Sequence, residues 1–282
     1  MTSPVPRGRG HPFFAGAPLL IAHRGGRALA PENTIPALEE AMERWGADML
    51  EIDVHATADG EVVVIHDETV DRTTDGTGRV DGRSLADLQA LDAGFRFTPD
   101  DGRTFPFRGQ DIRVPTLREV LQTLPTARLI IELKSAAVEG PLAALLDETG
   151  AAHRVQVASG GRFRKKMRRT PLLQSACSSE LWRFFLAQLA GVAGRVRWDV
   201  DALQMPDRHG LFHPVSRRLV RAAHARNLPV HVWTVNDPAE MRRFLAMGVD
   251  GLITDRPDLL ARVLHEERGR ALPPGLRQDA PA

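Results

Sequence analysis

Short apolar runs alternate with segments of helical spacing along most of the chain. Alternation of this kind predicts parallel strands joined by crossover helices, and eight such units predict an α/β fold, the (β/α)8 TIM-type barrel. An open, doubly wound sheet is the alternative, but Gly25-Gly26 does not form the G-x-G-x-x-G turn that usually accompanies it. The apolar runs lie at residues 19–22, 49–54, 129–131, 155–157, 172–173, 202–205, 230–233 and 251–253, and the helical patterns at 34–45, 116–121, 142–149, 179–189, 216–226, 238–247 and 257–265.

One further apolar run, residues 61–65, does not fit the alternation. It follows residues 51–57 after only Ala58-Asp59-Gly60, and so short a connection predicts an antiparallel hairpin with Asp59-Gly60 at its turn. Folding about that turn places Asp53 beside His66.

Residues 67–115 have little periodicity and several glycines, which predicts an insertion after the second barrel strand, over one face of the barrel. Four phenylalanines in it predict either a small core of its own or a contact with a hydrophobic leaving group: Phe95, Phe97, Phe105 and Phe107. We expect one barrel domain at residues 18–267. Residues 1–17 and 268–282 are expected to be flexible tails, because they are rich in Pro, Gly and polar residues.

The composition is that of a globular protein, and the charge balance favours chemistry on a small molecule. Of 282 residues, 43% are hydrophobic and 26% charged, and the net charge of +1 gives no basic surplus for a nucleic acid. No segment has the length of a membrane span or a signal peptide, so we expect a cytoplasmic protein with no integral membrane segment. Cys177, in an apolar run, is expected to be a packed thiol. The basic residues at 162–169 are expected to form a solvated face, with binding to anionic lipid as the alternative.

The strongest local signal is the pair of carboxylates in Glu51-Ile52-Asp53. Residues two apart in a strand face the same side, and two like charges there are costly without a cation between them. Glu132 ends another apolar run. Three carboxylates at strand ends predict an oxygen-rich site for one divalent cation, Mg²⁺ or Ca²⁺, whereas separate solvated side chains are the simpler alternative.

Two histidines and two cations end neighbouring strands. His23-Arg24 precedes Gly25-Gly26, glycines that we expect to let the backbone approach a ligand, and His66-Asp67 ends the hairpin. Lys134 lies two residues beyond Glu132 and, like Arg24, is suited to hold a phosphate. Two histidines near a carboxylate-bound cation are the groups that acid/base cleavage of a phosphodiester requires.

Two further residues are candidate pocket residues. Glu32 lies in Pro31-Glu32-Asn33-Thr34, a loop that leaves the C-terminal end of a strand. Asn33 or Thr34 is expected to cap the helix that follows. Trp233, in the seventh barrel strand, is expected either to line the pocket or to fill the barrel core.

Taken together and in this order, these segments resemble the glycerophosphodiester phosphodiesterase family. The resemblance covers residues 19–262, and one departure is Gly160, where many relatives have an aromatic residue. Besides the segments quoted above, it includes Arg72-Thr73-Thr74, Pro115-Thr116-Leu117, Ile131-Glu132-Leu133-Lys134, Val232-Trp233-Thr234-Val235-Asn236 and Gly251-Leu252-Ile253-Thr254-Asp255.

The resemblance implies hydrolysis of a small glycerophosphodiester to sn-glycerol 3-phosphate and an alcohol. It implies His23 and His66 as the acid/base pair, and the following ligands: Glu51, Asp53 and Glu132 for the metal, Arg24 for phosphate, and Lys134 for phosphate or glycerol. A lysophospholipase D-type activity is one alternative, favoured if the insertion's phenylalanines face solvent. A non-catalytic metal- or phosphate-binding barrel is another. The sequence carries no signal for the alcohol group, for Mg²⁺ against Ca²⁺, for which histidine acts first, or for an oligomeric state.

Overall fold

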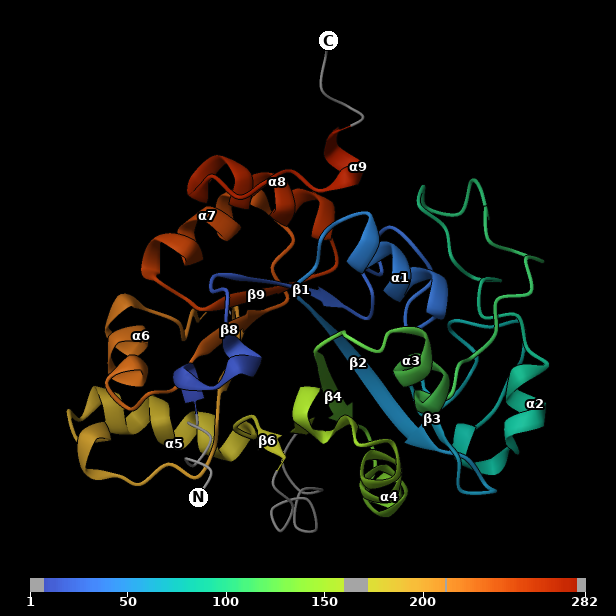
Figure 1. Ribbon diagram of the computed structural model, residues 1–282, viewed down its shortest axis with the longest axis horizontal. Coiled ribbons are helices and arrows are strands. Elements are labelled where there is room, and N and C mark those ends of the chain that lie inside the picture. The colour runs from blue at the N-terminus through green and yellow to red at the C-terminus, as the bar shows by residue number, and fades with distance from the viewer. Residues whose placement is uncertain (1–7, 160–171, 211, 278–282) are drawn as a thin grey trace.

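The computed structural model describes residues 8–159, 172–210 and 212–277, and a ring of helices surrounds its central sheet (Figure 1). Eight strands pair in parallel in the order β6-β5-β4-β2-β1-β9-β8-β7. The two ends of this path meet at a parallel bridge between Ser175 and Ala202. The (β/α)8 barrel predicted from the sequence is therefore confirmed.

The elements follow the predicted alternation. The strands are β1 (Leu19–His23), β2 (Met49–Ala56), β3 (Val62–Val64), β4 (Leu129–Leu133), β5 (Val155–Ser159), β6 (Leu173–Gln174), β7 (Leu203–Pro206), β8 (Val230–Trp233) and β9 (Gly251–Thr254). The helices are α1 (Ile35–Glu43), α2 (Leu85–Gln89), α3 (Leu117–Thr123), α4 (Glu139–Thr149), α5 (Ser178–Leu189), α6 (Arg217–His224), α7 (Pro238–Met247), α8 (Pro257–Arg268) and α9 (Pro274–Arg277).

Strand β3 pairs with β2 in the antiparallel direction, with Val54 opposite Val64. The turn between them includes Gly60 at φ +88°, a left-handed conformation that favours glycine. The amide of Ile65 donates to the carbonyl of Asp53 at 3.0 Å, which brings the following residue, His66, to the end of β2. The hairpin therefore has the turn and direction that the sequence indicates.

Alternating residues of the strands face two different cores. On β2, Leu50, Ile52 and Val54 belong to the large cluster beneath the helices. Met49 belongs to the smaller cluster inside the barrel. The same alternation turns the polar residues at the strand ends into the barrel mouth.

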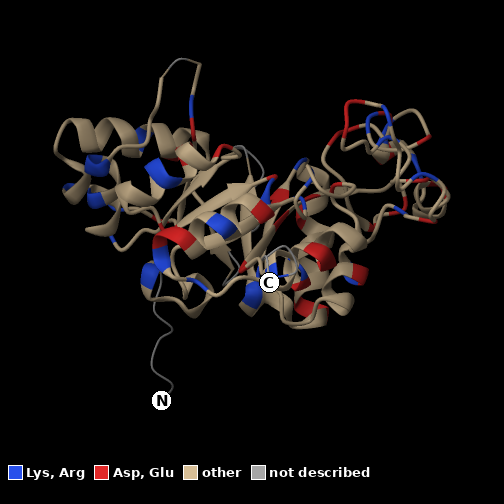
Figure 2. Cartoon of the chain, turned by 90° about the horizontal axis from the view of Figure 1, so that it is seen from above, with Lys and Arg blue, Asp and Glu red and all other residues tan. Residues whose placement is uncertain are grey.

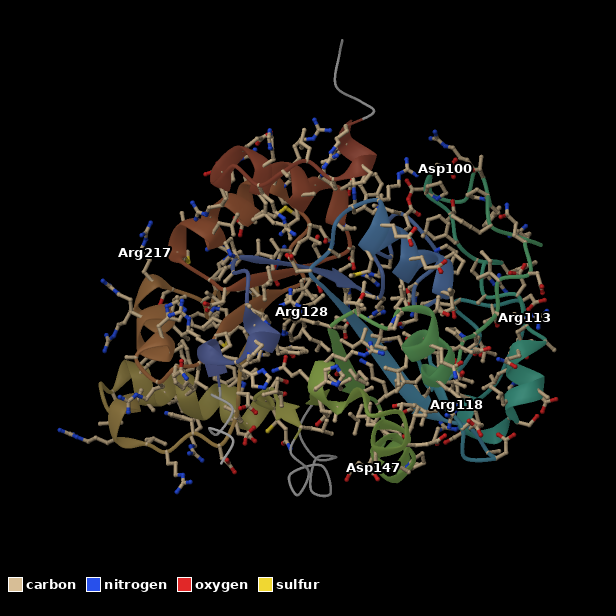
Figure 3. All side chains as sticks on the ribbon, viewed as in Figure 1. Asp100, Arg113, Arg118, Arg128, Asp147 and Arg217 are labelled. Carbon is tan, nitrogen blue, oxygen red and sulfur yellow. The ribbon has the colours of Figure 1, made fainter. Side chains whose placement is uncertain are left out.

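The N-terminal segment differs from the expected flexible tail over its described part. Residues Gly8–Gly10 and Pro12–Phe14 form short 3₁₀ turns, and Phe13 and Phe14 are buried in the inner cluster. Arg128 donates to the carbonyls of Phe13 and Ala15, each at 2.8 Å, and lies beside these turns in Figure 3. The free energy gained by burying two phenylalanines fixes this segment against the barrel, although its Pro and Gly content suggested a flexible tail.

The expected C-terminal tail, residues 268–282, is likewise packed over its described part. Helix α8 ends at Arg268, and Leu276 of the short helix α9 is buried. The amide of Gly275 donates to the carbonyl of Arg44 at 2.9 Å. A side chain at Gly275 would collide with Trp45, at 2.6 Å from its Cζ3.

The insertion, residues 67–115, forms a lobe beside the barrel, where Asp100 and Arg113 are labelled in Figure 3. Figure 2 shows that acidic and basic residues are interspersed along this lobe. Its own small core includes Val70, Val80 and Leu88, with Phe107 packed against them. Phe97 and Phe107 meet edge to face at 5.2 Å, and the guanidinium of Arg108 covers Phe95 and Phe105 at 4.2 and 3.8 Å. These contacts support the small-core interpretation of the phenylalanines.

Three further expectations concern the rest of the chain. Cys177 is a buried free thiol, as predicted. Arg162, Arg164, Lys165, Lys166, Arg168 and Arg169, and the departure at Gly160, lie outside the described residues. Among the described helices, none is both long and apolar enough to cross a membrane.

His231 on β8 should make the protein lose stability in mild acid. Its side chain is fully buried against Phe14, and neither ring nitrogen has a hydrogen-bond partner among the described residues. Burial lowers the pKa of His231 to about 4. Between about pH 6.5 and pH 4, His231 is therefore protonated in the unfolded chain but neutral in the folded chain, and this difference favours unfolding. Between pH 7 and pH 5 this costs about 2 kcal/mol of unfolding free energy.

The prediction is checked by urea unfolding at both pH values. His231→Leu should reduce the loss between pH 7 and pH 5 by about 2 kcal/mol. The control His153→Leu, at an exposed position, should leave the loss unchanged, and equal losses in all three proteins would contradict the prediction.

Candidate active site

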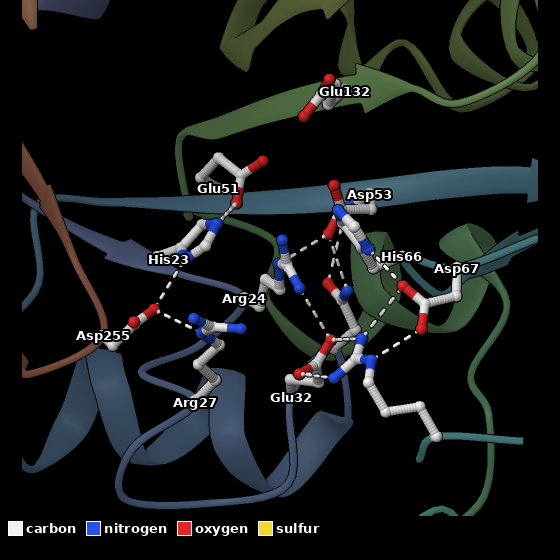
Figure 4. A network of polar contacts seen from close by, with 12 residues as sticks. His23, Arg24, Arg27, Glu32, Glu51, Asp53, His66, Asp67, Glu132 and Asp255 are labelled. Carbon is white, nitrogen blue, oxygen red and sulfur yellow. Dashed lines mark hydrogen bonds and ion pairs between the residues drawn. The ribbon is translucent and has the colours of Figure 1, made fainter. Parts of the chain in front are cut away.

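The register of three neighbouring strands assembles the acidic centre. Strand β1 sets His23 beside Glu51 of β2, and β2 sets Asp53 beside Glu132 of β4. Adjacent residues of a parallel sheet share a face, so these four side chains lie at one edge of the barrel (Figure 4). The amide of Lys134 donates to the carbonyl of Val54 at 3.2 Å and continues this pairing by one more residue.

The three predicted metal ligands converge. One carboxylate oxygen from each of Glu51, Asp53 and Glu132 lies within 4.8 Å of the other two. Glu51 and Asp53 are buried, and Oε2 of Glu51 has no hydrogen-bond partner among the described residues. Burial, together with the charges of Asp53 and Glu132, raises the pKa of Glu51 well above its ordinary value. A buried carboxylate without a partner, beside two others, fits the donor set of a hard divalent cation.

Asp53 is held by cationic and amide groups on both of its oxygens. Its Oδ2 accepts from Nδ2 of Asn33 at 3.0 Å and lies 3.1 Å from Nε of Arg24. Its Oδ1 lies 2.9 Å from Nζ of Lys134. Although burial opposes ionisation, the charges of Lys134, Arg24 and His66 hold the pKa of Asp53 below its ordinary value. Asp53 is therefore a fixed, ionised carboxylate.

Lys134 bridges two of the acidic residues. Its ammonium lies 2.9 Å from Asp53 and 2.9 Å from Oε2 of Glu132. Burial favours the neutral amine, but the two carboxylates outweigh it and raise the pKa of Lys134. Lys134 therefore remains a cation at the mouth of the barrel, where a phosphate can contact it.

His23 is oriented by Asp255, the residue directly after β9. Its Nδ1 lies 2.6 Å from Oδ1 of Asp255, and its Nε2 lies 3.8 Å from Oε2 of Glu51. Asp255 also accepts from Asn236 at 2.8 Å and pairs with Arg27 at 2.9 Å. Burial opposes ionisation, but the bond to His23 and these neighbours lower the pKa of Asp255 to about 2. An ionised Asp255 fixes the ring and leaves Nε2 free for chemistry.

His66 has the same kind of partner from a different part of the chain. Its Nδ1 lies 2.5 Å from Oδ1 of Asp67, and Arg72 donates to Oδ2 of Asp67 at 2.6 Å. The hydrogen bond from Arg72 and that with His66 lower the pKa of Asp67 to about 2. Two histidines, each with Nδ1 on a carboxylate, therefore flank the acidic centre (Figure 4).

Glu32 pairs with two arginines. It accepts from Nη1 of Arg24 at 3.0 Å and from Arg72 at 2.7 and 2.8 Å. Burial opposes ionisation, but the hydrogen bonds of Arg72 and the charge of Arg24 lower the pKa of Glu32. Glu32 does not line the active-site cavity described next, so its contact with substrate stays a prediction. Its observed contacts show that Glu32 holds the guanidinium of Arg24 in place.

A cavity of about 410 Å³ opens above these groups. His23, Arg24, Glu51, His66, Glu132 and Lys134 line it, with Trp233 and Thr234 on another wall. The side chain of Trp233 is 43% exposed, and its Nε1 donates to the carbonyl of Gln204 at 2.9 Å. Trp233 is therefore a pocket residue by position and not part of the barrel core.

Gly25 and Gly26, which were expected to let the backbone approach a ligand, are instead required by the packing of their loop. Gly25 and Gly26 have φ of +82° and +88°. A side chain would collide with Ala37 of α1 at Gly25, and with Pro257 of α8 at Gly26, at 2.9 and 2.8 Å. They let the loop fold tightly between two helices.

The loop before α1 contributes a residue whose role was not foreseen. Thr34 occupies the N-cap position without a side-chain capping bond, and its hydroxyl donates to the carbonyl of Pro31. Asn33, expected as a possible cap, instead adopts φ +58° and holds Asp53.

Asp67, Arg72, Asn236 and Asp255 were also missed as contributors to the site, although the family-like segments contain all four. The available signal was local for Asp67, which directly follows His66. The pairing of Asp255 with His23 joins residues 232 positions apart, and only the closed barrel brings them together.

Comparisons with known proteins agree with this geometry. A model of the glycerophosphoryl diester phosphodiesterase family matches residues 23–259. The chain is 35% identical over 262 residues to a glycerophosphodiester phosphodiesterase of Caldanaerobacter subterraneus subsp. tengcongensis, covering 88% of this chain and 98% of that protein. It is 31% identical over 265 residues to a glycerophosphodiester phosphodiesterase of Bacillus subtilis, covering 87% and 86% of the two chains.

Two solved structures extend the likeness to three dimensions. A glycerophosphodiester phosphodiesterase from Agrobacterium tumefaciens has a TM-score of 0.66 at 30% identity, covering 86% of this chain and 99% of that one. An Oleispira antarctica phosphodiesterase was solved in complex with the product sn-glycerol-3-phosphate. It has a TM-score of 0.69 at 25% identity, and the match covers 89% of this chain and 98% of that one.

Proposed function

The chain belongs to the glycerophosphoryl diester phosphodiesterase family and is a phosphoric diester hydrolase; from this premise we propose that it cleaves glycerophosphodiesters to sn-glycerol 3-phosphate and an alcohol with one divalent cation and two histidines. The observation that carries the proposal is the pair of carboxylate-bound histidines lining the same cavity as the acidic centre. The product complex of the Oleispira antarctica phosphodiesterase supports glycerol 3-phosphate as the product.

Glu51, Asp53 and Glu132 would hold the cation, Mg²⁺ or Ca²⁺. Their convergence and the unpartnered Oε2 of Glu51 support this assignment. When bound, such an ion supplies positive charge that stabilises the nonbridging oxygens of the phosphate in the transition state.

In the first step, His23 acts as the base. Because Asp255 holds Nδ1, Nε2 is the nitrogen that accepts the proton of the glycerol 2-hydroxyl. The glycerol oxygen attacks phosphorus, and the bond from phosphorus to the leaving alcohol breaks. His66, oriented by Asp67, donates a proton to the leaving oxygen.

In the second step the two roles reverse. His66 takes a proton from water, and the water oxygen attacks the phosphorus of the cyclic phosphate. The bond from phosphorus to the glycerol 2-oxygen breaks, and His23 returns a proton to that oxygen. Arg24 and Lys134 contact the phosphate oxygens, because both line the cavity as cations, Arg24 buried and Lys134 half-buried. Trp233 forms the wall against which the glycerol carbons pack.

The experiment that tests this function compares three substrates in buffer containing both ions. sn-Glycero-3-phosphocholine should release sn-glycerol 3-phosphate and choline in equal amounts. Bis(p-nitrophenyl) phosphate, which has no glycerol, should react far more slowly, and equal rates would contradict the proposal. An analogue without the glycerol 2-hydroxyl should not react, and its hydrolysis at the normal rate would instead indicate direct attack by water.

Asp255→Asn should lower kcat of the glycerophosphocholine reaction at least about 10- to 100-fold, the range for loss of a hydrogen-bonding partner that orients a histidine. The amide no longer offers two anionic oxygens to His23, Arg27 and Asn236 together. KM and the affinity for Mg²⁺ should change little, since neither depends on the orientation of His23. The matched control is Asp258→Asn, which pairs with Arg256 and does not line the cavity. A loss of kcat equal to that of the control would contradict the positioning role.

A further inference from the structure

Arg72, in the insertion of residues 67–115, reaches the edge of the active site and contacts two carboxylates at once. Its Nε and Nη2 donate to Oδ2 and Oδ1 of Asp67 at 2.6 and 3.2 Å. Its Nη1 and Nη2 donate to Oε2 and Oε1 of Glu32 at 2.7 and 2.8 Å. Arg72 does not line the active-site cavity, so any effect that it has on the reaction passes through these two carboxylates.

The two carboxylates that Arg72 joins hold different groups of the site. Asp67 holds Nδ1 of His66 at 2.5 Å, whereas Glu32 accepts from Nη1 of Arg24 at 3.0 Å. One end of this chain of contacts is therefore the proposed acid for the leaving alcohol, and the other is the proposed phosphate ligand (Figure 4). Because Arg72 donates to both carboxylates, it fixes the position of His66 relative to that of Arg24.

The orientation of His66 depends on Arg72 more than that of His23 depends on any one group. Within the described residues, the side chain of Asp67 pairs with His66 and Arg72 and is otherwise 30% exposed. The corresponding carboxylate at His23, that of Asp255, has two further partners. Without Arg72, Asp67 would be free to turn toward solvent.

The insertion holds the backbone of Arg72 in a tight turn. The amide of Thr74 donates to the carbonyl of Val70 at 3.0 Å, and the hydroxyl of Thr74 donates to the same oxygen at 2.9 Å. Thr74 and Val70 are both fully buried, and Val70 belongs to the small core of the insertion. That core therefore determines where the guanidinium of Arg72 lies.

We propose that Arg72 is a positioning residue through which the insertion holds Asp67, so that His66 delivers its proton to the leaving oxygen. The inference rests on the proposed function of the cavity. In the step concerned, the glycerol 2-oxygen bonds to phosphorus, the bond from phosphorus to the leaving oxygen breaks, and His66 gives its proton to that oxygen. Arg72 keeps its own protons throughout.

Two leaving groups that differ in their need for a proton test this role. The alkoxide of choline is a strong base and leaves with a proton, whereas p-nitrophenolate is a stable anion and leaves without one. The substrates are sn-glycero-3-phosphocholine and the p-nitrophenyl ester of sn-glycerol 3-phosphate. Alcohol release is measured in a single turnover with enzyme in excess, because His66 acts again in the second step.

Arg72→Met should slow choline release about 10- to 100-fold, part of the roughly 10²- to 10⁴-fold that a positioned acid supplies, and p-nitrophenol release less than about threefold. Arg72→Lys, which keeps a cationic donor, should recover part of the choline rate. His66→Ala should itself slow choline release. In that background Arg72→Met should slow it no further, because Arg72 acts through His66.

Arg79→Met is the matched control. Arg79 also lies in the insertion and donates to two carboxylates, those of Glu68 and Asp81, but does not line the cavity. Both alcohols should leave this variant at the wild-type rate. Equal losses of choline and p-nitrophenol release in Arg72→Met would overturn the proposal, as would a choline rate equal to that of the control or a further loss in the His66→Ala background. Wild type that does not release choline would contradict the proposed function instead.

Discussion

His23→Ala should lower kcat for sn-glycero-3-phosphocholine by about 10³- to 10⁴-fold, the upper range for removal of a general base. Among the described residues, the only other histidine that lines the cavity is His66, which Asp67 holds on the opposite side. No second histidine is therefore in place to replace His23 as the base. The measurement is release of sn-glycerol 3-phosphate at saturating substrate. Affinity for Mg²⁺, followed by calorimetry, should remain within a few-fold of wild type.

The combination of lost turnover and retained metal binding distinguishes an enzyme from a barrel that only binds metal or phosphate. His224→Ala is a suitable control, because His224 also has a carboxylate partner, Asp250 at 2.7 Å, and lies outside the cavity. A His23→Ala protein with wild-type turnover would contradict the mechanism.

Glu51→Gln should have the second large effect, and it should act in opposite directions on activity and stability. Removing one of three converging carboxylates should lower activity by about 10³-fold at limiting Mg²⁺, because the ion contributes several kcal/mol of transition-state stabilisation. The same change removes a buried, unpartnered oxygen that Asp53 and Glu132 repel. The metal-free variant should therefore melt about 2–4 °C higher, equivalent to about 1 kcal/mol.

Thermal melting with EDTA and with Mg²⁺ checks both parts. Mg²⁺ should raise the Tm of wild type, because it binds only the folded state, and should raise that of Glu51→Gln much less. Glu40→Gln, on the surface of α1, serves as control and should respond as wild type does. An equal response of Glu51→Gln and wild type to Mg²⁺ would exclude Glu51 as a ligand.

Much of the fold and the acidic centre could be predicted because both depend on local periodicity. Apolar alternation along β2 places Glu51 and Asp53 on one face, and strand order then places Glu132 beside them. Asp59-Gly60 predicts the hairpin, since a three-residue connection leaves no other geometry.

The sequence could not predict the orienting partners, because their contacts are long-range. Asp255 reaches His23 only when β9 pairs with β1 and closes the barrel. Asn33 looked like an ordinary helix cap, and its left-handed conformation, which turns it toward Asp53, depends on the packing of its loop. Within the described residues, the packing of the chain ends could not be predicted either: composition suggested flexible tails, whereas Phe13 and Leu276 are buried.

Metal-dependent hydrolysis is tested most directly by measuring sn-glycerol 3-phosphate release from sn-glycero-3-phosphocholine by EDTA-treated protein. We expect no release in EDTA, and recovery when Mg²⁺ or Ca²⁺ is returned in excess. The more effective ion identifies the one that the carboxylates of Glu51, Asp53 and Glu132 accommodate better. Full activity in EDTA, or no release with either ion, would contradict metal-dependent hydrolysis by this protein.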